Sequence, residues 1–147
     1  MYVTGIGRTK FGTLTDTMPE LIYQAMYNAI IDTPVSIEEI EAVYVSNFLG
    51  GPSEKQLHLN SVVSSLLPEL RLPIIRVETA CASGSSALFQ AIIALSRFEN
   101  MLVISKCHNG SKKSFSCICV PMWQRYRSLS VSRKYSLIYC LRKSYYT

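Results

Sequence analysis

The chain has 147 residues, 48% of them hydrophobic and 17% charged, which excludes a disordered chain and leaves room for one domain with a core. Its net charge of +5 comes with five cysteines that lack the spacing of a disulfide framework. No apolar run reaches the roughly 18 residues of a membrane span, and the first residues show no secretory signal, so we expect a cytoplasmic protein without a membrane span.

The first 104 residues alternate short apolar runs with amphipathic patterns. In chain order we expect a strand at residues 2–6, a helix at 17–32, a capping turn at 36–39, a strand at 42–48, a helix at 54–67, a strand at 73–77, a helix at 83–97 and a strand at 101–104. The apolar run at 42–48 is typical of a strand buried on both faces, and Gly-Gly-Pro at 50–52 should end it. The apolar helix at 83–97 should be buried on most of its surface in a complete domain, and should show apolar surface to water without the rest of that domain. Strands that alternate with helices indicate right-handed crossovers, so we predict an α/β fold with a mainly parallel sheet.

A single cysteine, Cys81, lies in the turn between the predicted strand at 73–77 and the predicted helix at 83–97. In a doubly wound sheet, chemistry collects beyond the carboxyl ends of the strands, and the positive end of a helix dipole favours a thiolate there. The backbone N–H of Cys81 would also stabilise an oxyanion on a carbonyl under attack. Its neighbours are the small residues Ala80, Ala82, Ser83 and Gly84. On the residues alone, Cys81 is either a nucleophile or a small buried hydrophobic residue.

The segment RVETACASGSSAL at residues 76–88 resembles the nucleophile segment of thiolases, particularly the branch with lipid-transfer-protein-like thiolases and archaeal acetyl-CoA acetyltransferases. Further segments follow in the family's order and spacing: GIGRTKFG at 5–12, IEEIEAVYVSNFLGG at 37–51, QLHLNSVVSSLL at 56–67 and LPIIRVETACASG at 72–84. The resemblance covers residues 1–104, which we interpret as a partial thiolase N-terminal domain with helices layered around an incomplete sheet. It implies that Cys81 is the acyl-accepting nucleophile.

This resemblance also implies an acyl-CoA C-acyltransferase of lipid metabolism, with a coenzyme A thioester as substrate and no metal or dissociable redox cofactor. Such chemistry needs a base for the thiol and an acid or base for the α-carbon. The family takes these groups from Gly-His-Pro and Cys-x-Gly motifs and shapes its oxyanion site with an Asn-Glu motif, and this sequence contains none of the three. The only histidines are His58 and His108, and the resemblance implies a structural or interface position for His58. We therefore expect a thiolase fragment that is inactive alone.

Two alternatives stay open. The first is a non-catalytic interaction protein that forms a homodimer or pairs with an intact thiolase subunit through the family's dimer surface. The second is a fragment of a ketoacyl synthase-type condensing domain, which also carries a Thr-Ala-Cys turn. The Ala-Ser-Gly that follows Cys81 and the opening segment at 5–12 favour the thiolase interpretation.

Residues 105–147 form a different kind of sequence, with nine basic residues and no acidic one, whereas residues 1–104 contain six basic and ten acidic residues. A metal site there would use Cys and His side chains that lack the usual Cys-x2–4-Cys spacing, namely Cys107, His108, Cys117, Cys119 and Cys140. Nucleic-acid binding would use aromatic residues among the basic ones, without a recognisable module, namely Trp123, Tyr126 and Tyr135. We favour a third interpretation, a tail without a recognisable fold produced by a shifted reading frame, and expect neither a metal nor a nucleic-acid partner.

Overall fold

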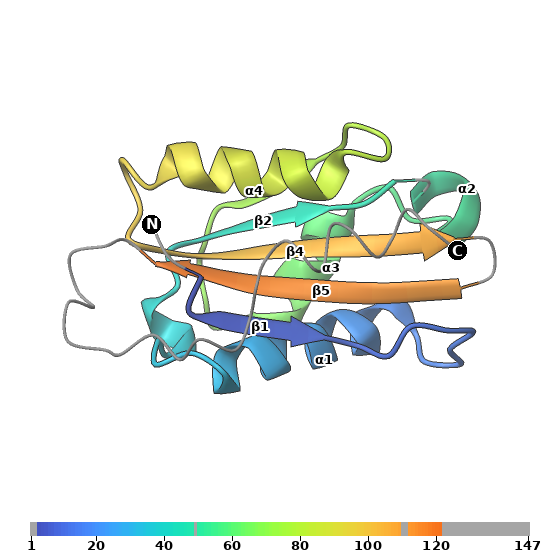
Figure 1. The fold of residues 1–147 in the computed structure, drawn as a ribbon, viewed down its shortest axis with the longest axis horizontal. Helices are drawn as coiled ribbons and strands as arrows, with labels where there is room; N and C mark the ends of the chain where they lie inside the picture. The colour runs from blue at the N-terminus through green and yellow to red at the C-terminus, as the bar shows by residue number, and fades with distance from the viewer. Residues whose placement is uncertain (1–2, 49, 110–111, 122–147) are drawn as a thin grey trace.

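The computed structural model describes residues 3–48, 50–109 and 112–121, and its core is a five-stranded sheet (Figure 1). The strands are β1 (Gly5–Arg8), β2 (Ala42–Ser46), β3 (Ile74–Val77), β4 (Asn100–Asn109) and β5 (Lys112–Pro121), in the spatial order β1-β5-β4-β2-β3. β2 runs parallel to β3 and β4, whereas β5 runs antiparallel to β4 and β1. The three adjacent parallel strands, joined through helices, confirm the predicted α/β fold.

Helices cover both faces of this sheet, as Figure 1 shows. They are α1 (Met18–Ile31), α2 (Gly50–Glu54), α3 (Leu59–Leu66) and α4 (Ser83–Ala94), with a short 3-10 helix at Ile37–Glu39. α1 and α3 pack on one face, and α4 packs on the other. Among the described residues, no helix combines the length and the apolar character that crossing a bilayer requires.

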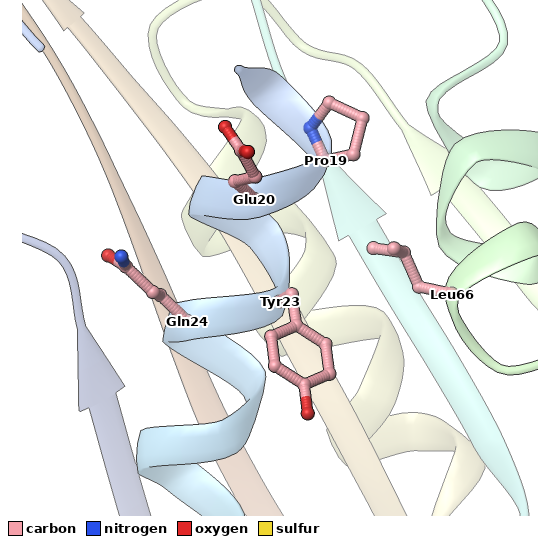
Figure 2. A pocket seen from close by; sticks show the side chains of 5 residues that line it. All are labelled: Pro19, Glu20, Tyr23, Gln24 and Leu66. Atoms are coloured by element: carbon pink, nitrogen blue, oxygen red, sulfur yellow. The ribbon is translucent and has the colours of Figure 1, made fainter. Parts of the chain in front are cut away.

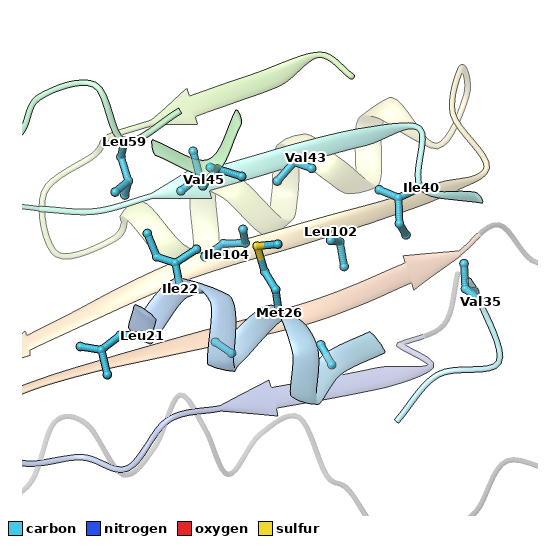
Figure 3. Packing of buried hydrophobic residues seen from close by; sticks show 13 residues of the cluster. Leu21, Ile22, Met26, Val35, Ile40, Val43, Val45, Leu59, Leu102 and Ile104 are labelled. Atoms are coloured by element: carbon cyan, nitrogen blue, oxygen red, sulfur yellow. The ribbon is translucent and has the colours of Figure 1, made fainter. Parts of the chain in front are cut away.

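The side chains of β2 alternate between two separate cores, because successive residues of a strand point to opposite faces. Val43 and Val45 belong to the larger core, which α1 and α3 cover and which Figure 3 shows. Ala42 and Tyr44 belong to the smaller core under α4. All five residues of β2 are buried, which confirms the prediction of a strand covered on both faces.

α1 begins where the sequence predicts. The N–H of Thr17 donates to Glu20 Oε2 at 2.7 Å and the Thr17 hydroxyl donates to the same oxygen at 2.8 Å, which fixes the first turn. The buried face of the helix consists of Leu21, Ile22, Ala25, Met26 and Ala29. β1 crosses this helix so closely that a Cβ on Gly7 would lie 2.0 Å from the carbonyl oxygen of Ala25, which explains the glycine.

The segment between β2 and β3 differs from the prediction. α2 forms at Gly50–Glu54, where only a chain break was predicted, and the helix predicted at 54–67 is confined to α3. A left-handed residue, Lys55 with a φ of 51°, follows α2. The glycine that opens α2 lies against a buried amide, since a Cβ on Gly50 would lie 2.0 Å from Asn47 Nδ2. Besides helping to end the strand, Gly50 therefore lets the start of α2 lie close to the Asn47 side chain.

β4 also extends beyond the predicted strand at 101–104. It reaches Asn109 and pairs with β5 along its whole length, from Asn109 opposite Lys112 to Asn100 opposite Pro121. The sequence predicts no recognisable fold after Ile104, whereas the described residues continue the sheet through Pro121. The physical reason is that backbone N–H and C=O groups alone form the ladder, so family-specific side chains are not needed.

The remaining predictions for the tail fall outside the described residues. Residues 122–147 lie outside, and with them Trp123, Tyr126, Tyr135 and Cys140. The side chains of Cys107, His108, Cys117 and Cys119 also lie outside the described part, although their backbones belong to β4 and β5. The division of the chain at Ile104 and the interpretations of the tail stay predictions.

Candidate active site

Cys81 lies in the loop that joins β3 to α4, and its side chain is exposed. β2 and β3 end side by side here, because Ser46 of β2 is paired with Val77 of β3. β4, whose Ser105 is also paired with Ser46, continues to Asn109. The chain therefore leaves the sheet beyond the carboxyl ends of β2 and β3, as predicted. The exposure of Cys81 excludes the interpretation of this residue as a buried hydrophobic one.

The turn before Cys81 is tight and contains a left-handed residue. Ala80 has a φ of 50°, a conformation that residues with a Cβ rarely adopt. Two backbone bonds close the turn: the N–H of Ala82 donates to the Thr79 carbonyl at 3.0 Å, and the N–H of Ser83 donates to the Ala80 carbonyl at 3.1 Å. A strained residue of this kind costs about 1–3 kcal/mol and persists only where its surroundings hold it, frequently at functional sites.

Hydroxyl groups connect this turn to the first turns of α4. Ser83 Oγ accepts a hydrogen bond from the N–H of Thr79 at 2.9 Å and donates one to the carbonyl of Ala80 at 2.6 Å. Thr79 Oγ1 and Ser86 Oγ lie 2.6 Å apart. Ser83 is 4% exposed, whereas Thr79 and Ala80 are exposed, so its two hydrogen bonds are partly buried. The loop that carries Cys81 is thus fixed to the helix at two points.

α4 starts directly after Cys81, with Ala82 as its N-cap residue. The positive end of the dipole of this twelve-residue helix therefore lies at the turn that carries Cys81. The first turn of α4 also lies close to β4, because a Cβ on Gly84 would lie 2.6 Å from Ser105 Oγ. Only glycine permits this approach without displacing Ser105, so Gly84 helps to set the position of the helix start.

A polar link joins the carboxyl ends of β2 and β3. Arg76 Nε donates to Asn47 Oδ1 at 3.1 Å, and the guanidinium of Arg76 forms an ion pair with Glu78. Asn47 is 1% exposed, and its Nδ2 atom has no hydrogen-bond partner among the described residues. The partly exposed ion pair contributes about 0–1 kcal/mol, so the link matters mainly for geometry at the start of the Cys81 loop.

In the described part of the chain, no histidine side chain is placed to act as a base for the Cys81 thiol. His58 precedes α3, on the face of the sheet opposite α4, and its side chain is exposed. Its backbone N–H donates to Gln56 Oε1 at 2.8 Å, and no hydrogen bond among the described residues joins it to Cys81. His108 belongs to β4, with its side chain outside the described part.

Two open depressions lie elsewhere on the surface. The first, of about 320 Å³, lies between α1 and α3, and Figure 2 labels its lining residues Pro19, Glu20, Tyr23, Gln24 and Leu66. The second, of about 380 Å³, lies beside α4 and includes Ile93 and Phe98. Cys81 lines neither of them, so a reagent would meet its thiol at an open surface. The described residues also contain no group of three or more His, Cys, Asp or Glu side chains able to hold a metal ion.

Sequence reasoning missed the hydroxyl cross-links and the link from β2 to β3. The spacing of Thr79, Ser83 and Ser86, at i, i+4 and i+7, is the pattern that could have suggested a shared face at the start of α4. Arg76 and Asn47 are 29 positions apart, and only the register of β2 against β3 brings them together. No local pattern in the sequence indicates that contact.

Sequence comparisons find relatives over the first part of the chain. A sequence model described as "Thiolase, N-terminal domain" matches residues 1–104. The acetyl-CoA acetyltransferase of Methanothermobacter thermautotrophicus is 36% identical over 104 residues, which are 70% of this chain and 27% of that protein. The "Non-specific lipid-transfer protein-like 2" of Caenorhabditis elegans is 32% identical over 93 residues, 60% of this chain and 21% of that protein. The chain thus spans about a quarter of the length of the curated relatives it matches.

Structural comparisons show the same fold in condensing enzymes. An acetyl-CoA acetyltransferase from Syntrophomonas wolfei matches with a TM-score of 0.61 at 21% identity, over 71% of this chain and 28% of that chain. A tetronic acid condensing enzyme matches with a TM-score of 0.69 at 14% identity, over 84% and 50%. The 3-oxoacyl-[acyl-carrier-protein] synthase III from Aquifex aeolicus VF5 matches with a TM-score of 0.62 at 15% identity, over 80% and 53%. At these identities the likeness shows the fold alone.

The fold likeness extends further along the chain than the sequence likeness. The match of 104 residues to the archaeal relative covers 70% of the chain, whereas two structural matches cover 80% and 84%. These structural matches therefore include residues after Ile104, where the structure has the rest of β4 and β5. The structural matches thus extend beyond the residues 1–104 that the family model matches.

Proposed function

Because this chain belongs to the thiolase family, with a match to the N-terminal domain of that family, we propose that Cys81 accepts an acyl group from a coenzyme A thioester. The observation that carries the proposal is the exposed thiol of Cys81 at the start of α4, inside the matched residues 1–104. An exposed cysteine beside the positive end of a helix dipole has the features of a reactive rather than a structural thiol.

The proposed step is a thioester exchange. The Cys81 thiolate attacks the carbonyl carbon of acetyl-CoA and forms an Sγ–C bond, while negative charge develops on the carbonyl oxygen. Collapse of this intermediate breaks the bond between the carbonyl carbon and the coenzyme A sulfur, and the released thiolate takes up a proton. Partial positive charge at the start of α4 stabilises both the attacking thiolate and the developing oxyanion.

We propose that the chain alone stops at the acylated cysteine. Transfer to or from a second acyl unit needs an acid or base at an α-carbon. The Gly-His-Pro, Cys-x-Gly and Asn-Glu motifs that supply such groups in the family are not in these 147 residues. Within the described part, His58 lies on the other face of the sheet, so the Cys81 proton must pass to solvent. We also propose a cytoplasmic location, where thiols stay reduced.

Peptide mass spectrometry tests the proposal. The chain is incubated with acetyl-CoA, digested and mapped, because five cysteines compete for the label. We expect acetylation at Cys81 above all other cysteines, and its loss in the Cys81→Ser variant. Equal labelling of the variant and the wild type would refute the proposal. Acylation by a carrier-protein thioester and not by acetyl-CoA would instead favour the ketoacyl synthase-type alternative.

A second candidate function is non-catalytic pairing with an intact thiolase subunit. The observation that favours it is the outer face of α4, where Phe89 and Ile93 are 62% and 60% exposed. Exposed apolar patches of this kind frequently mark protein interaction sites. Co-expression with an intact acetyl-CoA acetyltransferase should then give a stable complex that Phe89→Ser weakens. Separate elution of the two proteins at micromolar concentration would exclude the pairing.

A further inference from the structure

We propose that Ser83 is a positioning residue for Cys81, whose hydroxyl holds the preceding Ala80 in its left-handed conformation. The inference deepens the proposed acyl transfer and rests on it for its chemical consequence. Ser83 would orient the thiol and the backbone N–H of Cys81, without contacting a substrate itself.

The hydrogen bonds of Ser83 point backward along the chain. A capping hydroxyl normally accepts a bond from N–H groups further along its own helix, at positions N2 or N3. Ser83 Oγ instead accepts from the N–H of Thr79, four residues earlier, at 2.9 Å, and donates to the carbonyl of Ala80 at 2.6 Å. The N-cap position itself is held by Ala82, which has no side chain able to form such a bond. The Ser83 hydroxyl therefore serves the turn that precedes Cys81 and not the helix that follows.

Burial makes these two bonds difficult to replace. Ser83 is 4% exposed and both bonds are partly buried, so water replaces the hydroxyl only in part. The bonds enclose Ala80, the left-handed residue of the turn, with a φ of 50°. Without the hydroxyl, the N–H of Thr79 loses its acceptor and the carbonyl of Ala80 loses a donor. The Ala80 carbonyl then keeps only the bond from the Ser83 N–H, at 3.1 Å. The strained φ has less support, and the peptide between Ala80 and Cys81 is freer to rotate.

Rotation of that peptide affects thioester attack more than other thiol reactions. Attack on a thioester requires the Cys81 sulfur and the local N–H dipoles to meet one carbonyl group in a defined orientation. Alkylation by iodoacetamide requires only an accessible thiolate. The ratio of the two rates at Cys81 therefore reports on orientation separately from exposure and thiol ionisation.

The experiment compares Ser83→Ala with the matched control Ser85→Ala in the full chain. Ser85 is exposed, and its hydroxyl donates to the carbonyl of Ala82, inside the same helix. We expect Ser83→Ala to lower the ratio of acetylation to alkylation at Cys81 by about ten- to a hundredfold, and Ser85→Ala to leave it unchanged. A second substitution, Ala80→Gly, should restore part of the ratio in the Ser83→Ala background, because glycine adopts positive φ without strain. An unchanged ratio in Ser83→Ala would overturn the inference.

A spectroscopic measurement keeps the inference separate from the proposed function. If the wild type is not acetylated at Cys81, the acyl-transfer proposal fails, and the ¹³C shifts of Ala80 in alanine-labelled protein then decide the positioning role. A shift change in Ser83→Ala and none in Ser85→Ala supports it, and identical Ala80 shifts in all three proteins overturn it. If Ser83→Ala does not fold, hydrogen exchange of the wild-type Thr79 amide replaces this test. Slow exchange supports the bond to Ser83, and exchange at the rate of an unprotected amide overturns it.

Discussion

α1 and α4 lie on opposite faces of the sheet (Figure 1). Both are rich in apolar residues, but the sheet buries them to different extents. α1 buries a stripe of apolar side chains that includes Leu21 and Ile22, and its outer face carries Tyr23 and Tyr27, whose stacked rings have polar hydroxyls. α4 buries only small residues, namely Ser83, Ala87 and Ala91. Of its large side chains, Leu88 is half-buried, and Phe89, Ile92 and Ile93 are exposed.

This difference shows that apolar content does not by itself determine burial. A helix with a single apolar stripe can bury that stripe against one sheet. A helix that is apolar on all sides is typical of the interior of a larger protein. The apolar residues at 83–97 predict a helix that a complete domain buries on most of its surface and that shows apolar surface to water where such a cover is missing. The described chain has that exposed surface, because the sheet covers only the side of α4 with Ala87, Ala91 and the half-buried Leu88.

The largest expected effect is the difference in stability between isoleucine-to-alanine variants of α1 and of α4. Ile22 of α1 is 0% exposed and Ile93 of α4 is 60% exposed. We expect Ile22→Ala to lower the free energy of unfolding by about 2–5 kcal/mol, because it leaves a cavity, and Ile93→Ala to change it by less than about 0.5 kcal/mol. Urea unfolding measures both. Similar losses in the two variants would mean that the outer face of α4 is covered.

A glycine at the start of α4 tests how closely this helix lies on the sheet. Gly84→Ala places a Cβ 2.6 Å from Ser105 Oγ, so we expect a loss of about 1–3 kcal/mol in the free energy of unfolding. The control is Gly12→Ala, since a Cβ on Gly12 would have no atom within 4 Å. Adding Ser105→Gly to Gly84→Ala should recover most of the loss. Failure of that rescue would contradict the contact.

The exposed face of α4 should promote association. Each of Phe89 and Ile93 exposes most of its side chain, and burying one against a second molecule is worth about 1 kcal/mol. We expect the wild type to elute above its monomer mass of 16.5 kDa in size-exclusion chromatography, and Phe89→Ser together with Ile93→Ser to shift it toward the monomer. Tyr23→Ser on α1 is the control for surface change. A sharp wild-type monomer peak with a cooperative melt would contradict this expectation.

The smallest expected effect concerns pH and the start of α1. The N–H of Thr17, and then its hydroxyl, hold the pKa of Glu20 below its ordinary value of 4.5. Because the pKa is lowered in the folded state, the charge contributes stability above pH 4.5, and this contribution is lost as the pH falls through the folded-state pKa. Glu20→Gln should therefore be less stable than the wild type at neutral pH, with the gap closing in acid. A gap that is constant with pH would contradict this assignment.

Local patterns predict the helix start at Thr17 and the strand buried on both faces, because a helix cap and a continuous apolar run depend on neighbours in sequence. They also placed Cys81 correctly between β3 and α4. They missed β5, although Asn109-Gly110 between two extended runs is typical of a hairpin. The backward bonds of Ser83 and the link from Arg76 to Asn47 depend on a positive φ and on strand register, which no local pattern indicates.

The release of coenzyme A over time separates formation of a thioester at Cys81 from turnover. With excess acetyl-CoA, we expect a burst of free coenzyme A that levels off at or below one equivalent per chain and is absent in Cys81→Ser. After the burst, the rate should match the hydrolysis of acetyl-CoA without protein. Continued release above that rate, or no burst from the wild type, would contradict an acyl-accepting Cys81 in a chain that cannot complete the reaction alone.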